Sequence, residues 1–153
     1  VASAIRLQIT GKGKGMEEKI SELLRKWKGL LEGAWKEMPR HFRNDHTVRR
    51  TLQCFWFGRL KDMGFRVVAD YLPPRISDRP IDLIALNEED EIVYAVCFDT
   101  VVTLAAVKSL SSFESQNRII FTIGALEKKV QESRFFLKGD IQHCHLASPG
   151  TRS

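Results

Sequence analysis

Residues 79–100, RPIDLIALNEEDEIVYAVCFDT, carry the pattern that decides the fold. Two apolar runs, PIDLIAL and IVYAVCFDT, flank the acidic turn NEEDE. Runs rich in Ile, Val and aromatic residues on either side of such a turn are typical of paired β-strands. Asp82 stands near the start of the first run and Asp99 near the end of the second. Because a short connection makes the pair antiparallel, we expect both carboxylates at the same end of the two strands.

The rest of the chain predicts further elements around this hairpin. Hydrophobic spacing of three and four residues indicates two helices before it, and alternation of strand-forming and helix-forming segments continues after it. The fold class is therefore α/β, with a helix, a three-stranded antiparallel meander, a crossover helix and a further, parallel strand. The expected elements are helices over 16–37, about 46–63, 103–116 and 125–138, and strands over 65–72, 80–86, 92–100, 118–124 and 140–146. Asp45 and Thr103 are the expected caps of the second and third helices.

Length and composition fit one domain. The chain has 153 residues, of which 43% are hydrophobic, enough for one real core. We expect a flexible lead-in over 1–15, a single domain over 16–146 (N-terminal helix 16–37, core 46–146) and a loose tail over 147–153. Three widely spaced cysteines do not suggest a disulfide framework. With no secretory pattern and no long apolar run, this favours a cytoplasmic, nucleoid or nuclear location, with no membrane association.

The formal net charge is +5, and its distribution is uneven. Basic residues dominate 40–66, and acidic residues dominate 78–99. A basic surface beside an acidic pocket suits nucleic-acid binding, with phosphates on one and a cation in the other. The alternative is that the basic and acidic segments form two ordinary solvated faces, or that they pair with each other. The candidate nucleic-acid contacts lie near the start of the second helix, where backbone N–H groups also favour phosphate; they are Arg40, Arg43, His46, Arg49 and Arg50.

The order of elements, with an aspartate on the second strand, resembles the PD-(D/E)XK nuclease superfamily, the restriction-endonuclease-like fold, over roughly residues 46–123. Pro80-Ile81-Asp82 stands where that family has its Pro-Asp element, with one residue between. The family's acid–any residue–lysine tripeptide aligns with Cys97-Phe98-Asp99, which matches at neither end. Some members carry a glutamate on the first core helix, and Gln53 is the nearest substitute here.

The resemblance implies Mg²⁺ or Mn²⁺ as the cofactor of an active site of this kind. A thiol is a poor ligand for Mg²⁺, and Asp99 adds negative charge where the family has lysine. The leading hypothesis is therefore a nucleic-acid-binding domain, for DNA rather than RNA, whose metal site is degenerate and non-catalytic, with no cofactor. The alternative is a metal-dependent deoxyribonuclease or other phosphodiesterase, with Asp82 and Asp99 as metal ligands and Lys108 assisting catalysis.

Two further patterns lie in the N-terminal helix and in the last expected strand. The apolar stripe of helix 16–36 indicates packing onto the domain, and its alternative use is a homodimer or partner-subunit surface in an interaction scaffold. His143-Cys144-His145 has the residue types of a zinc site, with both histidines on one strand face. No second ligand pair with suitable spacing accompanies them, so the sequence does not favour zinc. Cys97, inside an apolar strand, is expected to be a small buried side chain.

Overall fold

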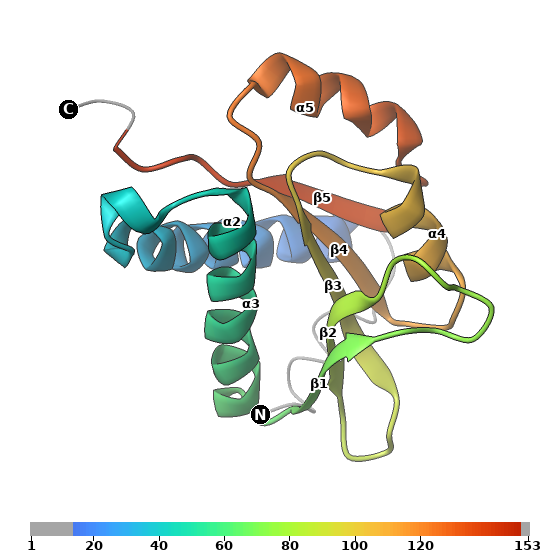
Figure 1. Ribbon diagram of the computed structural model, residues 1–153. Coiled ribbons are helices and arrows are strands. Elements are labelled where there is room, and N and C mark those ends of the chain that lie inside the picture. Colours follow the sequence, from blue (N-terminus) through green and yellow to red (C-terminus); the bar gives the residue numbers. More distant parts are fainter. Residues whose placement is uncertain (1–13, 151–153) are drawn as a thin grey trace.

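The computed structural model describes residues 14–150 and is built around one mixed β-sheet (Figure 1). Its five strands lie side by side in chain order. The first three form an antiparallel meander, and the last three run parallel to one another, as the sequence predicts for the meander and the first crossover. The strands are β1 (Arg66–Tyr71), β2 (Ile81–Leu86), β3 (Ile92–Asp99), β4 (Asn117–Thr122) and β5 (Ile141–His145).

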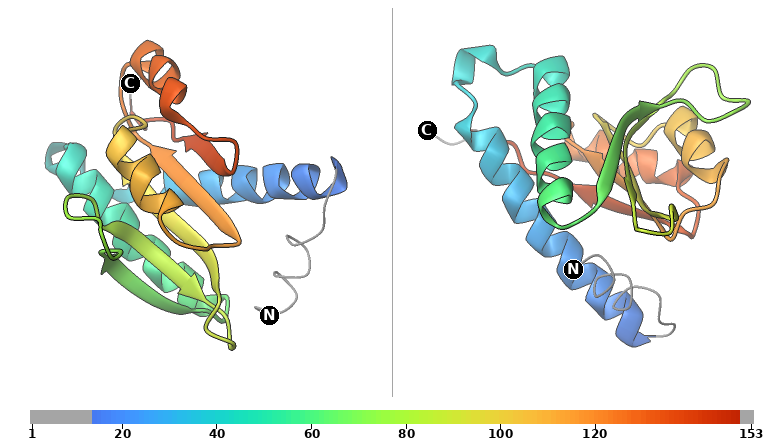
Figure 2. Two further views of the ribbon diagram at one scale, coloured as in Figure 1. Left: turned by 90° about the vertical axis from the view of Figure 1, so that its right-hand side faces the viewer. Right: turned by 90° about the horizontal axis from the view of Figure 1, so that it is seen from below.

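Helices cover both faces of the sheet (Figures 1 and 2). Two long helices pack on one face, and two short helices, each a crossover between parallel strands, lie on the other. The long helices are α2 (Lys14–Glu37) and α3 (Asp45–Asp62), and the short ones are α4 (Leu104–Ser111) and α5 (Glu127–Ser133). Two short 3₁₀ turns complete the order, η1 (Arg40–Phe42) and η2 (Arg134–Phe136). No helix among residues 14–150 is long and apolar enough to cross a membrane.

An aromatic cluster fills the core between the long helices and the sheet. The Trp27 ring centroid lies 4.9 Å from that of Trp56 and 4.8 Å from that of Tyr94. Leu31 and Leu52 in the same cluster are fully buried. The apolar stripe of helix 16–36 therefore packs on its own domain, as expected. Figure 2 shows that the N-terminal part of α2 projects past the sheet.

Helix ends differ from the expected ones for local reasons. Asn44, rather than Asp45, is the N-cap of α3, because its extended backbone lets its side chain accept a hydrogen bond from the Thr47 N–H, and the Thr47 hydroxyl completes a capping box. Thr103 caps α4 as predicted, but α4 ends at Ser111. The Ser112 hydroxyl donates to the Ser109 carbonyl, a local bond that competes with further helix.

The segments expected to be flexible lie partly outside the described residues. Residues 1–13 and 151–153 are not described, while residues 14 and 15, expected in the lead-in, belong to α2. The start of the expected loose tail is held against the domain. Arg40 donates to the Gly150 carbonyl at 3.2 Å, Arg43 donates to the Pro149 carbonyl at 3.4 Å, and the Ala147 N–H donates to Glu32 at 2.6 Å.

Candidate functional site

A pocket of about 300 Å³ opens between the first half of α3 and the sheet, where β2 begins and β3 ends. This is the end of the hairpin at which the sequence predicts the acidic site. The pocket combines basic side chains from α3 with acidic side chains from the strands. Its lining residues are His46, Arg49, Arg50, Gln53, Asp70, Arg79, Pro80, Asp82 and Phe98.

One arginine lies between the two predicted carboxylates. Arg79 Nη2 lies 3.1 Å from Asp82 Oδ2 and 3.2 Å from Asp99 Oδ2. The three side chains are largely buried, with 14%, 16% and 11% of their surfaces exposed. Asp82 and Asp99 are therefore brought together, as predicted, but around a guanidinium. A fourth charged group is near, since Arg49 Nη1 lies 3.8 Å from Asp99 Oδ1.

The backbone around this cluster explains its geometry. The antiparallel pairing of β2 and β3 places the start of one strand beside the end of the other. The Phe98 N–H donates to Asp82 Oδ2 at 2.6 Å, which fixes the carboxylate against the end of β3. The Ser109 hydroxyl of α4 donates to the Arg79 carbonyl, which ties the loop before β2 to a helix. Arg79 is thus anchored on both its backbone and its side chain.

The charges in this cluster influence one another. Burial alone would lower the pKa of the Arg79 guanidinium, but the acidic side chains around it, Cys97, Asp82 and Asp99, together raise that pKa above its usual value. Burial raises the pKa of Asp99, and the Arg79 guanidinium partly offsets this. Arg79 therefore stays charged, and its charge counteracts the effect of burial on the pKa of Asp99.

The residues present do not fit a divalent metal. Mg²⁺ requires several oxygen ligands in octahedral geometry and keeps waters among them. Here the Oδ2 atoms of Asp82 and Asp99 both face the Arg79 guanidinium, and Cys97, which aligns with the second acid of the resembled superfamily, is fully buried. Burial raises the pKa of the Cys97 thiol to about 12. Within the described residues, no group of three or more His, Cys, Asp or Glu side chains is placed to hold a metal ion.

Gln53 faces the site, as predicted, and connects three elements. Its Nε2 donates to Asp70 Oδ1 at 2.8 Å and to the Asp82 carbonyl at 2.9 Å. Its Oε1 accepts a hydrogen bond from Arg50 Nη1 at 2.9 Å. Arg50 Nη1 also lies 3.3 Å from Asp70 Oδ2. The amide thus joins α3 to β1 and β2, and its orientation is set by the donors and acceptors around it.

The five predicted nucleic-acid contacts divide into two groups. His46, Arg49 and Arg50 line the pocket. Arg40 and Arg43 instead lie at the linker before α3, where Arg43 donates to the carbonyls of Lys36 and Met38 as well as to the C-terminal segment. These last two arginines hold chain segments together. Lys108, assigned a catalytic role in the alternative hypothesis, is exposed and does not line the pocket.

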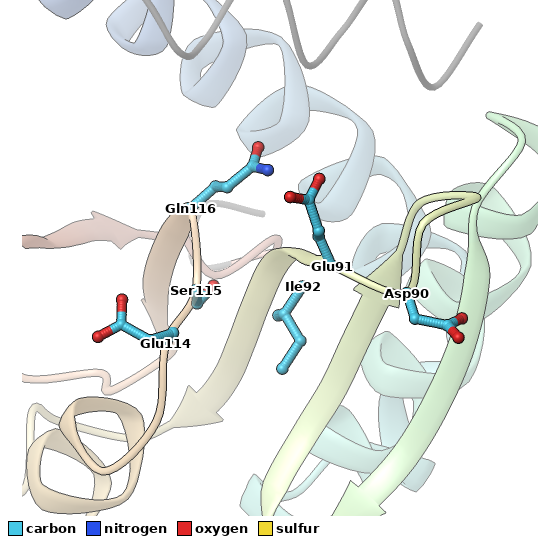
Figure 3. A pocket seen from close by; sticks show the side chains of 6 residues that line it. All are labelled: Asp90, Glu91, Ile92, Glu114, Ser115 and Gln116. Atoms are coloured by element: carbon cyan, nitrogen blue, oxygen red, sulfur yellow. The ribbon is translucent and has the colours of Figure 1, made fainter.

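The acidic residues of the 87–91 turn lie away from this site, at the opposite end of β3. A hairpin places its turn far from the ends of its strands, so the acidic segment 78–99 is divided between two places rather than forming one pocket. A second pocket lies at the turn, lined by Asp90, Glu91, Ile92, Glu114, Ser115 and Gln116 (Figure 3). Figure 3 shows the three carboxylates pointing in different directions.

The His143-Cys144-His145 segment forms β5 and a hydrogen-bonded cluster, not a metal centre. Cys144 faces the aromatic core, while Thr122 Oγ1 lies 2.8 Å from His143 Nε2 and 2.9 Å from His145 Nδ1. Arg134 Nη1 lies 3.0 Å from His143 Nδ1. Since arginine can only donate, Nδ1 of neutral His143 accepts and Nε2 carries the proton. That nitrogen therefore has no lone pair to offer a metal.

Sequence reasoning missed two residues of the pocket. Arg79 lies within the segment described as acidic, three residues before Asp82, and that spacing is the only signal that could have identified it. Asp70, at the end of an apolar strand, gave no signal at all, because its contribution depends on a backbone conformation with φ of 56°.

Comparisons with known proteins give the fold a context. No family model matches this chain, and no curated protein matches it. Among solved structures, it is similar to the crystal structure of a repair endonuclease from Pyrococcus abyssi, with a TM-score of 0.38 and 14% sequence identity. The match covers 70% of this chain and 49% of that one, so this chain spans about half the length of the matched structure.

Proposed function

We propose that this chain is a nuclease-like domain that binds the phosphate backbone of nucleic acid, DNA in the first place, without metal-dependent hydrolysis. The observation that carries the proposal is the Arg79 guanidinium between Asp82 and Asp99. A fixed positive charge occupies the space that a cation needs, and it is held there by a largely buried pair of ion contacts. The acidic groups serve to hold an arginine rather than a metal.

Phosphate binding is supported by the basic side chains at the mouth of the pocket. The side chains of Arg49 and Arg50 are 37% and 53% exposed, so both can reach a ligand. Guanidinium groups pair with phosphate through two parallel hydrogen bonds. Contacts of this kind position a backbone without selecting its sequence.

The test is a binding and cleavage experiment on labelled duplex DNA, single-stranded DNA and RNA, with Mg²⁺ or Mn²⁺ titrated into each. We expect salt-sensitive binding without cleavage at any metal concentration, and stronger binding to DNA. Arg49→Ala with Arg50→Ala should weaken binding at least tenfold, since each lost charge-assisted contact is worth about 1.5–3 kcal/mol. Lys128→Ala with Lys129→Ala, on exposed α5, removes the same charge and is the matched control.

Two outcomes would contradict the proposal. Metal-dependent cleavage that is lost in Asp82→Asn would show that the site is catalytic despite Arg79. Equal weakening by the α3 pair and the α5 pair would show that binding follows net charge and does not use this pocket. Stronger binding to RNA than to DNA would contradict the preference for DNA, while the pocket would remain the proposed binding site.

A further inference from the structure

Asp70 interrupts the ladder between β1 and β2. The pairing runs from Arg66 to Ala69, passes over Asp70, and resumes at Tyr71. The cause is the Asp70 backbone, whose φ of 56° lies in the left-handed region. Aspartate is one of the few residues with a side chain that adopt this conformation readily. A strand residue with a positive φ beside a pocket is uncommon, and residues with such backbone conformations cluster at functional sites.

The turned backbone directs the Asp70 carboxylate across to α3. Oδ1 accepts from Gln53 Nε2 at 2.8 Å, and Oδ2 lies 3.3 Å from Arg50 Nη1. Asp70 lines the main pocket and also an adjoining one that runs along α3 past Cys54 and Phe57. The carboxylate thus stands at the point where the two pockets meet, with the Arg50 guanidinium beside it.

We propose that Asp70 is an internal competitor for phosphate, an acidic contact that holds Arg50 until nucleic acid displaces it. This inference rests on the proposed function. The Asp70 and Arg50 side chains are 48% and 53% exposed, and an ion pair so open to water is weak. A phosphate with two oxygens available is the better partner for a guanidinium. Asp70 therefore holds Arg50 while the pocket is empty and releases it when a phosphate binds. Breaking this ion pair lowers the affinity of the pocket for the phosphate.

The test compares Asp70→Asn with the wild type by fluorescence anisotropy on one labelled DNA duplex at fixed salt. Asparagine also adopts positive φ and keeps the oxygen that accepts from Gln53, so the variant should fold, which thermal unfolding will check. We expect it to bind about two- to fivefold more tightly, the range that an exposed ion pair supports. Asp62→Asn, at the opposite end of α3, changes the charge equally and should bind like the wild type.

A double variant decides whether the effect acts through Arg50. In an Arg50→Ala background, Asp70→Asn should give no gain, because there is no guanidinium left to release. A gain that persists in that background, or that Asp62→Asn reproduces, would overturn the inference in favour of a general charge effect, while the proposed function would stand. No gain in Asp70→Asn alone would also overturn it. Absence of DNA binding by the wild type and by Asp70→Asn would overturn both proposals.

Discussion

At the scale of single residues, Arg79 has the greatest influence on the site. Its guanidinium is the positive partner of two carboxylates that are more than four-fifths buried. Two such carboxylates facing each other without a cation would repel, and one of them would take up a proton. The same arginine therefore stabilises this end of the β2–β3 pair, and in our proposal it also occupies the place that a metal ion would need.

Arg79→Ala should destabilise the fold by about 3–5 kcal/mol, because it leaves buried charge without its partner. Urea unfolding measures the loss, and exposed Arg75→Ala in the same loop is the control. Adding Mg²⁺ should restore part of the stability of the variant, by binding the two carboxylates in the folded state only. The wild type should show no such gain. An equal gain in the wild type would mean that the metal ion can bind while Arg79 is in place.

Gln53→Glu should also destabilise the protein, by roughly 2–4 kcal/mol, although it introduces the residue type that some members of the resembled superfamily have on this helix. Gln53 is 5% exposed, and its Nε2 donates to Asp70 and to the Asp82 carbonyl. A carboxylate there loses both donors and faces another carboxylate. Gln131→Glu on the exposed surface of α5 makes the same chemical change and should leave the urea midpoint unchanged. A Gln53→Glu protein as stable as the wild type would show that the amide is not needed.

The individual residues differ in how far the sequence predicts them. Asp82, Asp99 and Gln53 were placed correctly, because strand pairing and helical spacing determine their positions. The position of Arg79 was not predicted. This residue lies in the loop before β2, and strand pairing does not determine where a loop directs its side chains. Asp70 could not be predicted either, since its role depends on one backbone angle. Whether His46, Arg49 and Arg50 contact nucleic acid stays a prediction.

At the scale of elements, the strands were predicted well and the helix ends less so. β3 is buried along almost its whole length, and a continuous apolar run is the expected pattern for a central strand with helices on both faces. Helix ends depend on single side-chain hydrogen bonds, such as that of Asn44 in α3. The short α5 continues as the 3₁₀ turn η2. Hydrophobic spacing does not distinguish an α-helix from a 3₁₀ turn that follows it.

The hydrogen bonds that link His143 of β5 to Thr122 of β4 and to Arg134 of η2 should make stability depend on pH. The pKa of His143 is lowered to about 4 by burial, with Arg134 and His145 adding to the effect. The unfolded chain, with an ordinary pKa near 6.5, then binds a proton more readily than the folded chain. Stability is complete above about pH 6.5 and is lost as the pH falls toward 4. The pKa of His145 is also lowered, chiefly by burial, and adds in the same direction.

Urea unfolding at a series of pH values between these limits measures the effect. His143→Gln should reduce the slope of stability against pH, and part of the slope should remain because of His145. His41→Gln, at an exposed position, is the control and should leave the slope unchanged. A wild-type stability that does not fall between pH 6.5 and 4 would contradict the assignment of a neutral, hydrogen-bonded His143.

At the scale of the whole molecule, the charge distribution limits how the domain can bind. The chain carries a formal charge of +5, yet around the pocket three arginines, Arg49, Arg50 and Arg79, stand against three aspartates, Asp70, Asp82 and Asp99. In the proposed complex with DNA, long-range attraction comes from the surface as a whole, and contacts in the pocket replace ion pairs that already exist. Such an arrangement favours moderate affinity and easy release.

The dependence of DNA affinity on salt should show how many phosphates the pocket engages. For duplex DNA, the slope of log K against log salt changes by about 0.9 for each phosphate contact. Arg50→Ala should therefore reduce the slope by about one unit, because the residue it removes contacts a phosphate in our proposal. Lys128→Ala on α5 should leave the slope close to that of the wild type. Equal slopes for all three proteins would mean that the Arg50 guanidinium does not meet the backbone, and that DNA, if it binds, uses another face of the domain.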